Sequence, residues 1–374
     1  MTSKSIFFLN NTFKIFVLAA LFLVLPNYIF AQQNVHPQQD KEEINKIEHC
    51  EVKEPFNFSE MILHHIADSH EWHLASIGHT HITIPLPIII LSKDRGIEIF
   101  SSSKFHSEGE LHEGEKEEHT YKGYYIDEED HKIKHVESDR RIVDISITKN
   151  VASMLISIAL LCGIFITIAN RYRNHKGEAP KGIQSLFEPL IIFVRDDIVK
   201  TNIGGKNAEK FLPYMLTLFF FILFNNLLGL LPGGANLTGN IAVTLTLAVL
   251  TLILTLLNSK SNYWLHIFAP PGIPLWLLPI MVPVEILGVF TKPIALMIRL
   301  FANITGGHIV ILSFVGLIFL FKNATVALAS IPVVVAMNFL ELLVAFLQAY
   351  IFTLLSCMYI GSAVEEHGEH DHGH

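Results

Sequence analysis

The chain is poor in charge, in cysteine and in basic clusters. Only 17% of its 374 residues are charged, whereas soluble domains carry about 25%. With 51% hydrophobic residues and a mean hydropathy of +0.42, a soluble globular enzyme is not expected. The three cysteines, Cys50, Cys162 and Cys357, are too few and too scattered for a disulfide framework. No basic stripe is present, which excludes a nucleic-acid-binding protein.

The charge that is present lies mainly in the first part of the chain. Residues 32–145 contain 24 Asp and Glu against 12 Lys and Arg, and they hold 13 of the 20 histidines. Residues 146–374 are apolar and nearly neutral, with 11 acidic and 13 basic residues. We therefore divide the chain into an acidic, His-rich N-terminal region, 32–148, and a membrane domain, 149–366, followed by a His-rich tail, 367–374.

The first 31 residues have the order of a secretory signal peptide. Lys4 and Lys14 precede an apolar run over 15–25, and the small residue Ala31 follows at the expected cleavage point. The alternative is a first membrane helix, but 11 strongly apolar residues fall short of the roughly 20 needed to cross a bilayer. We therefore expect residues 1–31 to be removed and residues 32–148 to be exported.

The exported region predicts two short strands, over 82–91 and 96–100, and a solvated loop over 106–119. Its histidines allow two interpretations. His70 and His73 would share a face of a helix, and His79 and His81 a face of a strand, so a metal site is possible in principle. No Cys partner or HExxH motif fixes a geometry, and the alternative is a solvated, pH-sensitive surface. The same two interpretations apply to the histidines of the tail, 367–374. The histidines concerned in the exported region are His64, His65, His70, His73, His79 and His81.

The membrane domain predicts an all-α polytopic fold with five transmembrane helices. The last two hydrophobic stretches number 38 residues each, which as helices would reach about 57 Å. Because the hydrocarbon core is about 30 Å thick, we expect a long, steeply tilted hairpin that turns at 321–323. The five predicted spans are 151–170, 211–231, 240–257, 283–320 and 325–362.

Residues 183–200 are too short and too charged to cross the membrane. Phe187, Leu190, Ile191 and Val194 would share one helical face, so an interfacial helix is expected here. The basic stretch 171–181 follows the first span, which by the positive-inside rule is cytoplasmic. This orientation places the N-terminal region in the periplasm and the C-terminus in the cytoplasm.

Polar residues within the last two helices indicate a function. Charged groups at membrane depth are costly and mark ion paths or proton relays. Glu285, Lys292 and Arg299 recur every seven residues and so form one stripe, with Asn303 one turn beyond and His308 on roughly the opposite side. The alternative is a polar network that only holds helices together, but such bonds contribute about 0.6 kcal/mol on average. The last predicted helix, 325–362, carries Asn338, Glu341, Gln348, Ser356 and Tyr359.

At these positions the sequence resembles subunit a of the F-type ATP synthase, over about 151–366. The specific matches are Ile298-Arg299-Leu300-Phe301-Ala302-Asn303 and Leu347-Gln348-Ala349-Tyr350-Ile351-Phe352. Further matches are Lys292-Pro293, Gly306-Gly307-His308, Glu341, Pro283–Glu285, Thr238-Gly239-Asn240 and Asn225-Asn226-Leu227-Leu228-Gly229-Leu230-Leu231-Pro232.

The resemblance implies roles for individual residues. It places the family's essential arginine at Arg299, its glutamine at Gln348 and its asparagine at Asn303. The acid–histidine pair of the outer half-channel falls on His308 and Glu341, and Glu285 falls in the inner half-channel. The implied partners are a ring of c subunits, subunit b and the other synthase subunits, in a bacterial inner membrane.

The resemblance also implies a non-catalytic subunit without cofactor or metal. No nucleotide-binding motif occurs in the chain, so we expect ATP chemistry to belong to other subunits. The long N-terminal region departs from the family's usual short N-terminus, so its role stays open. The choice between H⁺ and Na⁺ also stays open. A secondary transporter or a metal sensor is the alternative function, but transporters show repeated halves and none is visible here.

Overall fold

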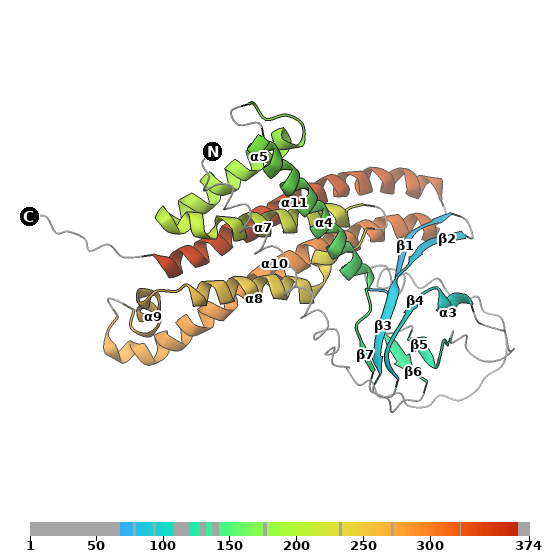
Figure 1. Cartoon of the computed structure of the whole chain (residues 1–374), viewed down its shortest axis with the longest axis horizontal. Coiled ribbons are helices and arrows are strands. Elements are labelled where there is room, and N and C mark those ends of the chain that lie inside the picture. The colour runs from blue at the N-terminus through green and yellow to red at the C-terminus, as the bar shows by residue number, and fades with distance from the viewer. Residues whose placement is uncertain are drawn as a thin grey trace, which may run out of the picture.

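The computed structural model describes residues 68–365 except for short gaps (Figure 1). The gaps are 78–79, 93–94, 108–119, 128–131, 137–141, 175–177, 232–233, 271–272 and 322. The expected signal peptide, His64, His65, His79 and the tail 367–374 therefore lie outside the described residues.

The described chain is mainly helical, as the hydrophobic stretches predict. Four of its helices are long and apolar enough to cross a membrane, which confirms a polytopic α-helical membrane protein. A fifth crossing is possible if α8, Ile241–Leu257, is counted together with α9, Ser261–Phe268, although the two are bent by 103°. The four long helices are α4, Lys149–Asn174; α7, Gly205–Gly229; α10, Leu278–Phe321; and α11, Ala324–Val364.

The last two helices form the expected hairpin. Helix α10 has 44 residues and ends at Phe321, and α11 has 41 residues and begins at Ala324. The two helices pack along each other, and Figure 1 shows them as the long orange and red ribbons. Asn323 begins α11, because its side-chain oxygen accepts a hydrogen bond from Thr325 N at 3.0 Å.

The segment predicted as an interfacial helix is continuous but irregular. Helix α5, Ile183–Phe193, leads into a π-helical segment, Val194–Lys200, and then into α6, Thr201–Ile203. Phe187 and Val194 are buried in the main core and Leu190 and Ile191 pack against it, so the predicted face is the packed one. Its depth in the membrane stays a prediction.

Two glycines shape the end of this segment, where α6 lies against α11. Gly204 has φ +68°, a conformation that favours glycine, and it separates α6 from α7. A Cβ added to Gly361 of α11 would lie 2.2 Å from the backbone oxygen of Asn202. The backbones of α6 and α11 can therefore approach each other only because position 361 has no side chain.

The sequence did not predict the short connecting helices. Besides α9, they are the 3-10 turns η2, Leu237–Gly239, and η3, Leu275–Leu277. In α9 the rings of Trp264 and Phe268 stack with centroids 6.2 Å apart, and both residues are exposed.

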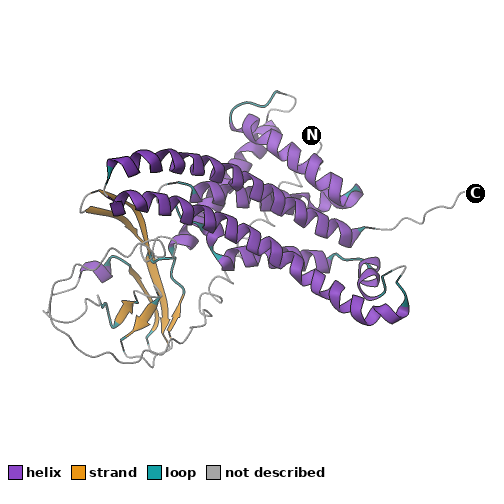
Figure 2. Cartoon of the chain, turned by 180° about the vertical axis from the view of Figure 1, so that it is seen from behind, coloured by secondary structure: helices purple, strands orange, loops and turns teal. Residues whose placement is uncertain are grey.

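The N-terminal region is a small β structure attached to the start of α4 (Figure 2). Strands β1, Glu71–Ile77, and β2, Thr80–Pro85, form one antiparallel pair. A second sheet has the order β4-β3-β7 and a third pairs β5 with β6. The bounds are β3, Pro87–Ser92; β4, Gly96–Ser101; β5, Tyr124–Ile126; β6, Ile133–His135; and β7, Ile142–Asp144, with a short helix α3, Lys104–Ser107.

Three predictions for this region need correction. The single strand over 82–91 is wrong, because β2 ends at Pro85 and β3 begins at Pro87 in another sheet; proline removes ladder donors at these ends. The shared helical face of His70 and His73 is also wrong, because His73 lies in β1, where apolar and polar residues alternate. The loop predicted over 106–119 begins later, because α3 extends to Ser107.

A buried polar junction connects the β structure to α4. The Asp68 carboxylate accepts hydrogen bonds from Thr148 Oγ1 at 2.9 Å and from Asn150 N at 3.1 Å, which caps the helix. Burial raises the pKa of Asp68 above its ordinary value of 3.8, although these bonds act in the opposite direction. Nearby, buried His70 places Nε2 2.9 Å from Asp144 Oδ2.

Candidate functional site

A carboxylate and a histidine meet between α10 and α11. Glu341 is 4% exposed, and its Oε1 lies 2.5 Å from His308 Nδ1, within ion-pair distance. Apart from this contact, neither oxygen of Glu341 has a hydrogen-bond partner among the described residues. A buried carboxylate without such bonds is energetically costly, and groups of this kind concentrate at functional sites.

Gly307 makes room for this carboxylate. A Cβ at Gly307 would lie 3.0 Å from Glu341 Oε1 and 3.3 Å from Cδ. The carboxylate therefore rests directly against the backbone of α10, one residue before His308. The paired residues and this glycine come from the two motifs that the sequence analysis singled out.

A chain of buried amides and hydroxyls adjoins the pair. Asn226 of α7 donates from Nδ2 to the backbone oxygen of Ala345 at 3.1 Å, one turn beyond Glu341. Thr238 Oγ1 donates to Asn226 Oδ1 at 2.7 Å. Thr305 Oγ1 lies 3.5 Å from the Gly239 oxygen, which links the same loop to α10. These contacts connect the η2 loop to α10 and to α11 one turn from Glu341.

Gln348 lies on the same buried stripe of α11 as Glu341. A spacing of seven residues brings it to nearly the same helical angle, and it is 3% exposed. The stripe is continuous over about four turns and faces the interior of the bundle. Its buried members are Glu341, Ala345, Gln348, Phe352 and Ser356.

Arg299, in contrast to these buried residues, lies on an exposed face of the helix bundle. Its side chain is exposed on α10, as is that of Asn303 one turn later. The Arg299 guanidinium makes no hydrogen bond or ion pair with any residue in the described part of the chain, although it lies within electrostatic range of Tyr359. Exposed apolar neighbours such as Ile294 and Ile298 surround it.

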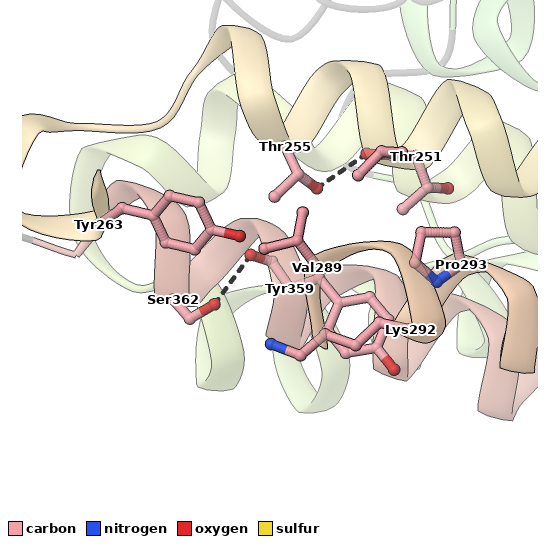
Figure 3. A pocket seen from close by; sticks show the side chains of 9 residues that line it. Thr251, Thr255, Tyr263, Val289, Lys292, Pro293, Tyr359 and Ser362 are labelled. Atoms are coloured by element: carbon pink, nitrogen blue, oxygen red, sulfur yellow. Dashed lines mark hydrogen bonds between the residues drawn. The ribbon is translucent and has the colours of Figure 1, made fainter. Parts of the chain in front are cut away.

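A second polar cluster lies toward the other end of α10. Side chains from α8, α9, α10 and α11 line a small pocket there (Figure 3). Lys292 Nζ lies 5.5 Å from the ring centroid of Tyr359, and half-buried Glu285 is within electrostatic range of Tyr263. The lining residues are Thr251, Leu252, Thr255, Tyr263, Val289, Lys292, Pro293, Tyr359 and Ser362.

The structure thus brings together some candidate residues and separates others. His308, Glu341 and Gln348 are on the interior side, Arg299 and Asn303 are exposed, and Glu285 is in the second cluster. Along α10, Arg299 is nine residues from His308 and fourteen from Glu285, about 14 Å and 21 Å of helix.

Sequence reasoning gave no role to several polar residues of these clusters. Asn226 and Thr238 lie in the stretches 225–232 and 238–240 that resemble the family, so these two motifs could have indicated their role. Tyr263 had none, because the helix that carries it was not expected. Among the described residues, no group of three His, Cys, Asp or Glu side chains could hold a metal ion.

Comparison with known proteins gives two family matches. The model of the ATP synthase A chain family matches residues 151–361, which run from the first turn of α4 to the last turn of α11 and include Glu285, Arg299, Asn303, His308, Glu341 and Gln348. The chain belongs to the ATP synthase A chain family. A second model, a domain of unknown function (DUF8433), matches residues 61–153 and so contains the β structure.

Similar proteins include several that are named ATP synthase subunit a. The chain is 48% identical over 239 residues to ATP synthase subunit a of Chloroherpeton thalassium, which covers 62% of this chain and 71% of the relative. It is 47% identical over 239 residues to ATP synthase subunit a of Chlorobium phaeobacteroides, with 62% and 69% covered.

Proposed function

We propose that this chain is the membrane subunit that forms two proton half-channels beside the rotating ring of c subunits, and that it couples proton flow to rotation and ATP synthesis. Arg299 carries the proposal. Placing an arginine at membrane depth costs about 2.5–3.5 kcal/mol even on a lenient scale. An exposed guanidinium without a partner in the described chain requires an anionic partner elsewhere, and a ring carboxylate is such a partner.

The outer half-channel contains His308, Glu341 and Gln348. Two observations support this assignment: the His308–Glu341 contact is buried, and the hydrogen bonds from the η2 loop through Asn226 end on Ala345, one turn from Glu341. A proton that enters along this route passes to a ring carboxylate. The neutral carboxyl group then rotates through lipid without the cost of burying a charge.

The inner half-channel is the second cluster, with Glu285 at its centre. The pocket lined by Thr255, Tyr263 and Ser362 offers hydroxyl groups along which a released proton can leave (Figure 3). Asn303 lies next to Arg299 on the exposed face, where it adds a polar contact for the ring.

Arg299 separates the two half-channels. A guanidinium stays protonated at any relevant pH, so it favours the ionised form of the ring carboxylate that passes it. Its fixed positive charge also opposes direct proton passage between the two clusters. Each proton that crosses 100 mV supplies about 2.3 kcal/mol.

The surroundings of the chain follow from the same proposal. Residues 1–31 are a signal peptide, the region 32–148 is periplasmic, the domain 149–366 spans the cell inner membrane, and the tail 367–374 is cytoplasmic. The partners are the c-ring, subunit b, the other synthase subunits and membrane lipid, and nucleotide chemistry belongs to other subunits.

The decisive experiment compares ATP-driven proton uptake by inverted membrane vesicles that contain the natural chain or Arg299→Ala. We expect uptake to be lost in the variant while the complex stays assembled. Unchanged uptake with an assembled complex would mean that Arg299 has only a structural role, and the proposal would be wrong.

A further inference from the structure

One face of the three-stranded sheet in the N-terminal region is covered and the other is bare. Ile88 and Ile90 of β3 are 0% exposed and belong to the core with Phe105 and Tyr124. The alternate residues of the same strand, Ile89 and Leu91, point to the opposite face.

The bare face is a regular array of aliphatic side chains. The register places Ile89 opposite Ile99 and Leu91 opposite both Ile97 and Val143. Ile145 completes the first row, because its N–H donates to the Ile89 oxygen at 2.8 Å. The array, here called the aliphatic face, thus has two rows of three residues across β4, β3 and β7: Ile99, Ile89 and Ile145, then Ile97, Leu91 and Val143.

Exposure of this face is large for such side chains. Ile97 and Ile99 are 69% and 67% exposed, and Leu91, Val143 and Ile145 are 37–43% exposed. A strand with four consecutive aliphatic residues, Ile88 to Leu91, is typical of strands covered on both faces. Contiguous apolar patches on a polar domain mark contact surfaces.

We propose that the segment 56–66 of this same chain covers the aliphatic face. It is rich in large apolar residues, and Phe58, Ile62 and Ile66 recur every fourth residue, so they lie on one side of the segment if it is helical. Met61 falls one turn from Phe58 on the same side. The DUF8433 match begins at residue 61, so the end of this segment belongs to the same recurring unit as the sheet.

The attachment point of the segment is at the edge of the aliphatic face. Asp68 is fixed to Thr148 and Asn150 at the start of α4. Ile145 lies three residues before Thr148, and Ile66 lies two before Asp68, distances of about 10 Å and 7 Å of extended chain. A connection this short gives the segment a high effective concentration at the face.

A lipid surface fits the aliphatic face less well. None of its six residues is Trp or Tyr, which favour the membrane interface. The surrounding region 32–145 has a net charge of −12, which opposes contact with anionic headgroups.

Photo-crosslinking in the assembled, membrane-embedded complex tests this proposal. A benzophenone side chain is placed at Ile99, and a matched control carries it at exposed Lys104 of α3. We expect Ile99 to crosslink to a peptide from 56–66 and Lys104 not to. Crosslinks from Ile99 to lipid, to another subunit or to a second copy, or no crosslink, would overturn the proposal.

Hydrogen exchange provides a second readout that needs no bulky probe. The double variant Ile62→Asp/Ile66→Asp removes the apolar contact, and Glu60→Asp is the conservative control. We expect amides of β3 and β4 to exchange about tenfold faster or more in the double variant. Equal exchange in both variants would contradict the proposal.

Discussion

His308 of α10 and Glu341 of α11 face each other across the contact between these helices, with Nδ1 and Oε1 2.5 Å apart. The contact places a titratable pair against the buried amide and hydroxyl groups of the same bundle. If the pair is part of a proton path, the effect on proton uptake of changing one residue should depend on which residue occupies the other position.

We therefore expect the exchanged pair, His308→Glu with Glu341→His, to retain more ATP-driven proton uptake than either single variant. Each single change places two like groups in contact, whereas the double change restores one acid and one base. Proton uptake by inverted vesicles measures the coupling through a double-mutant cycle. A double variant no better than the worse single variant would show that the two residues act independently.

Gly307→Ala should impair the same path through space alone. The added Cβ would lie 3.0 Å from Glu341 Oε1, and overpacking of this kind costs about 1–3 kcal/mol. We expect proton uptake to fall several-fold while the complex still assembles. Gly288→Ala is the matched control on the same helix, because no atom lies within 4 Å of the added Cβ, and it should leave uptake unchanged.

Arg299→Lys should abolish coupled ATP synthesis although it conserves the formal charge. At membrane depth, away from water, a lysine can lose its proton, and it lacks the planar group that contacts a carboxylate through two nitrogens. ATP synthesis by energised vesicles is the measurement, with Arg173→Lys at the exposed end of α4 as control. Wild-type synthesis in Arg299→Lys, at levels matching the control, would refute the proposed role of the guanidinium.

The sequence predicted the parts of this fold that depend on long hydrophobic runs. The α10–α11 hairpin and the place where it turns follow from where apolar residues stop, although α10 begins at Leu278, before the predicted start at 283. The π-helical segment and α9 do not, because they depend on local packing and on a bend of 103° rather than on composition. The three-residue strand β7 is likewise too short to show a period and exists through its pairing with β3.

Some residues of the candidate site could be predicted from the sequence and others could not. The motifs contained His308, Glu341 and Arg299, but no spacing rule indicates that Asn226 donates to the backbone of Ala345 from another helix. That contact joins residues 119 positions apart in sequence. Only tertiary packing places it one turn from Glu341.

Asp68→Asn should make the junction between the β structure and α4 more stable at neutral pH. Burial raises the pKa of Asp68 in the folded protein, so its contribution is favourable below the unfolded pKa, about 3.9, and is lost as pH rises through the folded pKa. An asparagine is neutral throughout, can accept from Asn150 N and can donate to Thr148 Oγ1. The gain should therefore appear near pH 7 and vanish toward pH 4.

Amide protection in β3 and at the start of α4, compared at the two pH values, measures this effect. Asp68→Ala is the control, because it removes both hydrogen bonds and should cost about 0.5–2 kcal/mol, as the loss of a helix cap does. Asp144 responds in the opposite sense. Burial acts to raise its pKa, but hydrogen bonds from His70 and Ser146 lower it overall, so its contribution is lost only at acid pH. Since Asp144 is present in every variant, its effect cancels in the comparison. Lower protection of Asp68→Asn than of the natural chain at pH 7 would show that the ionised carboxylate stabilises the cap.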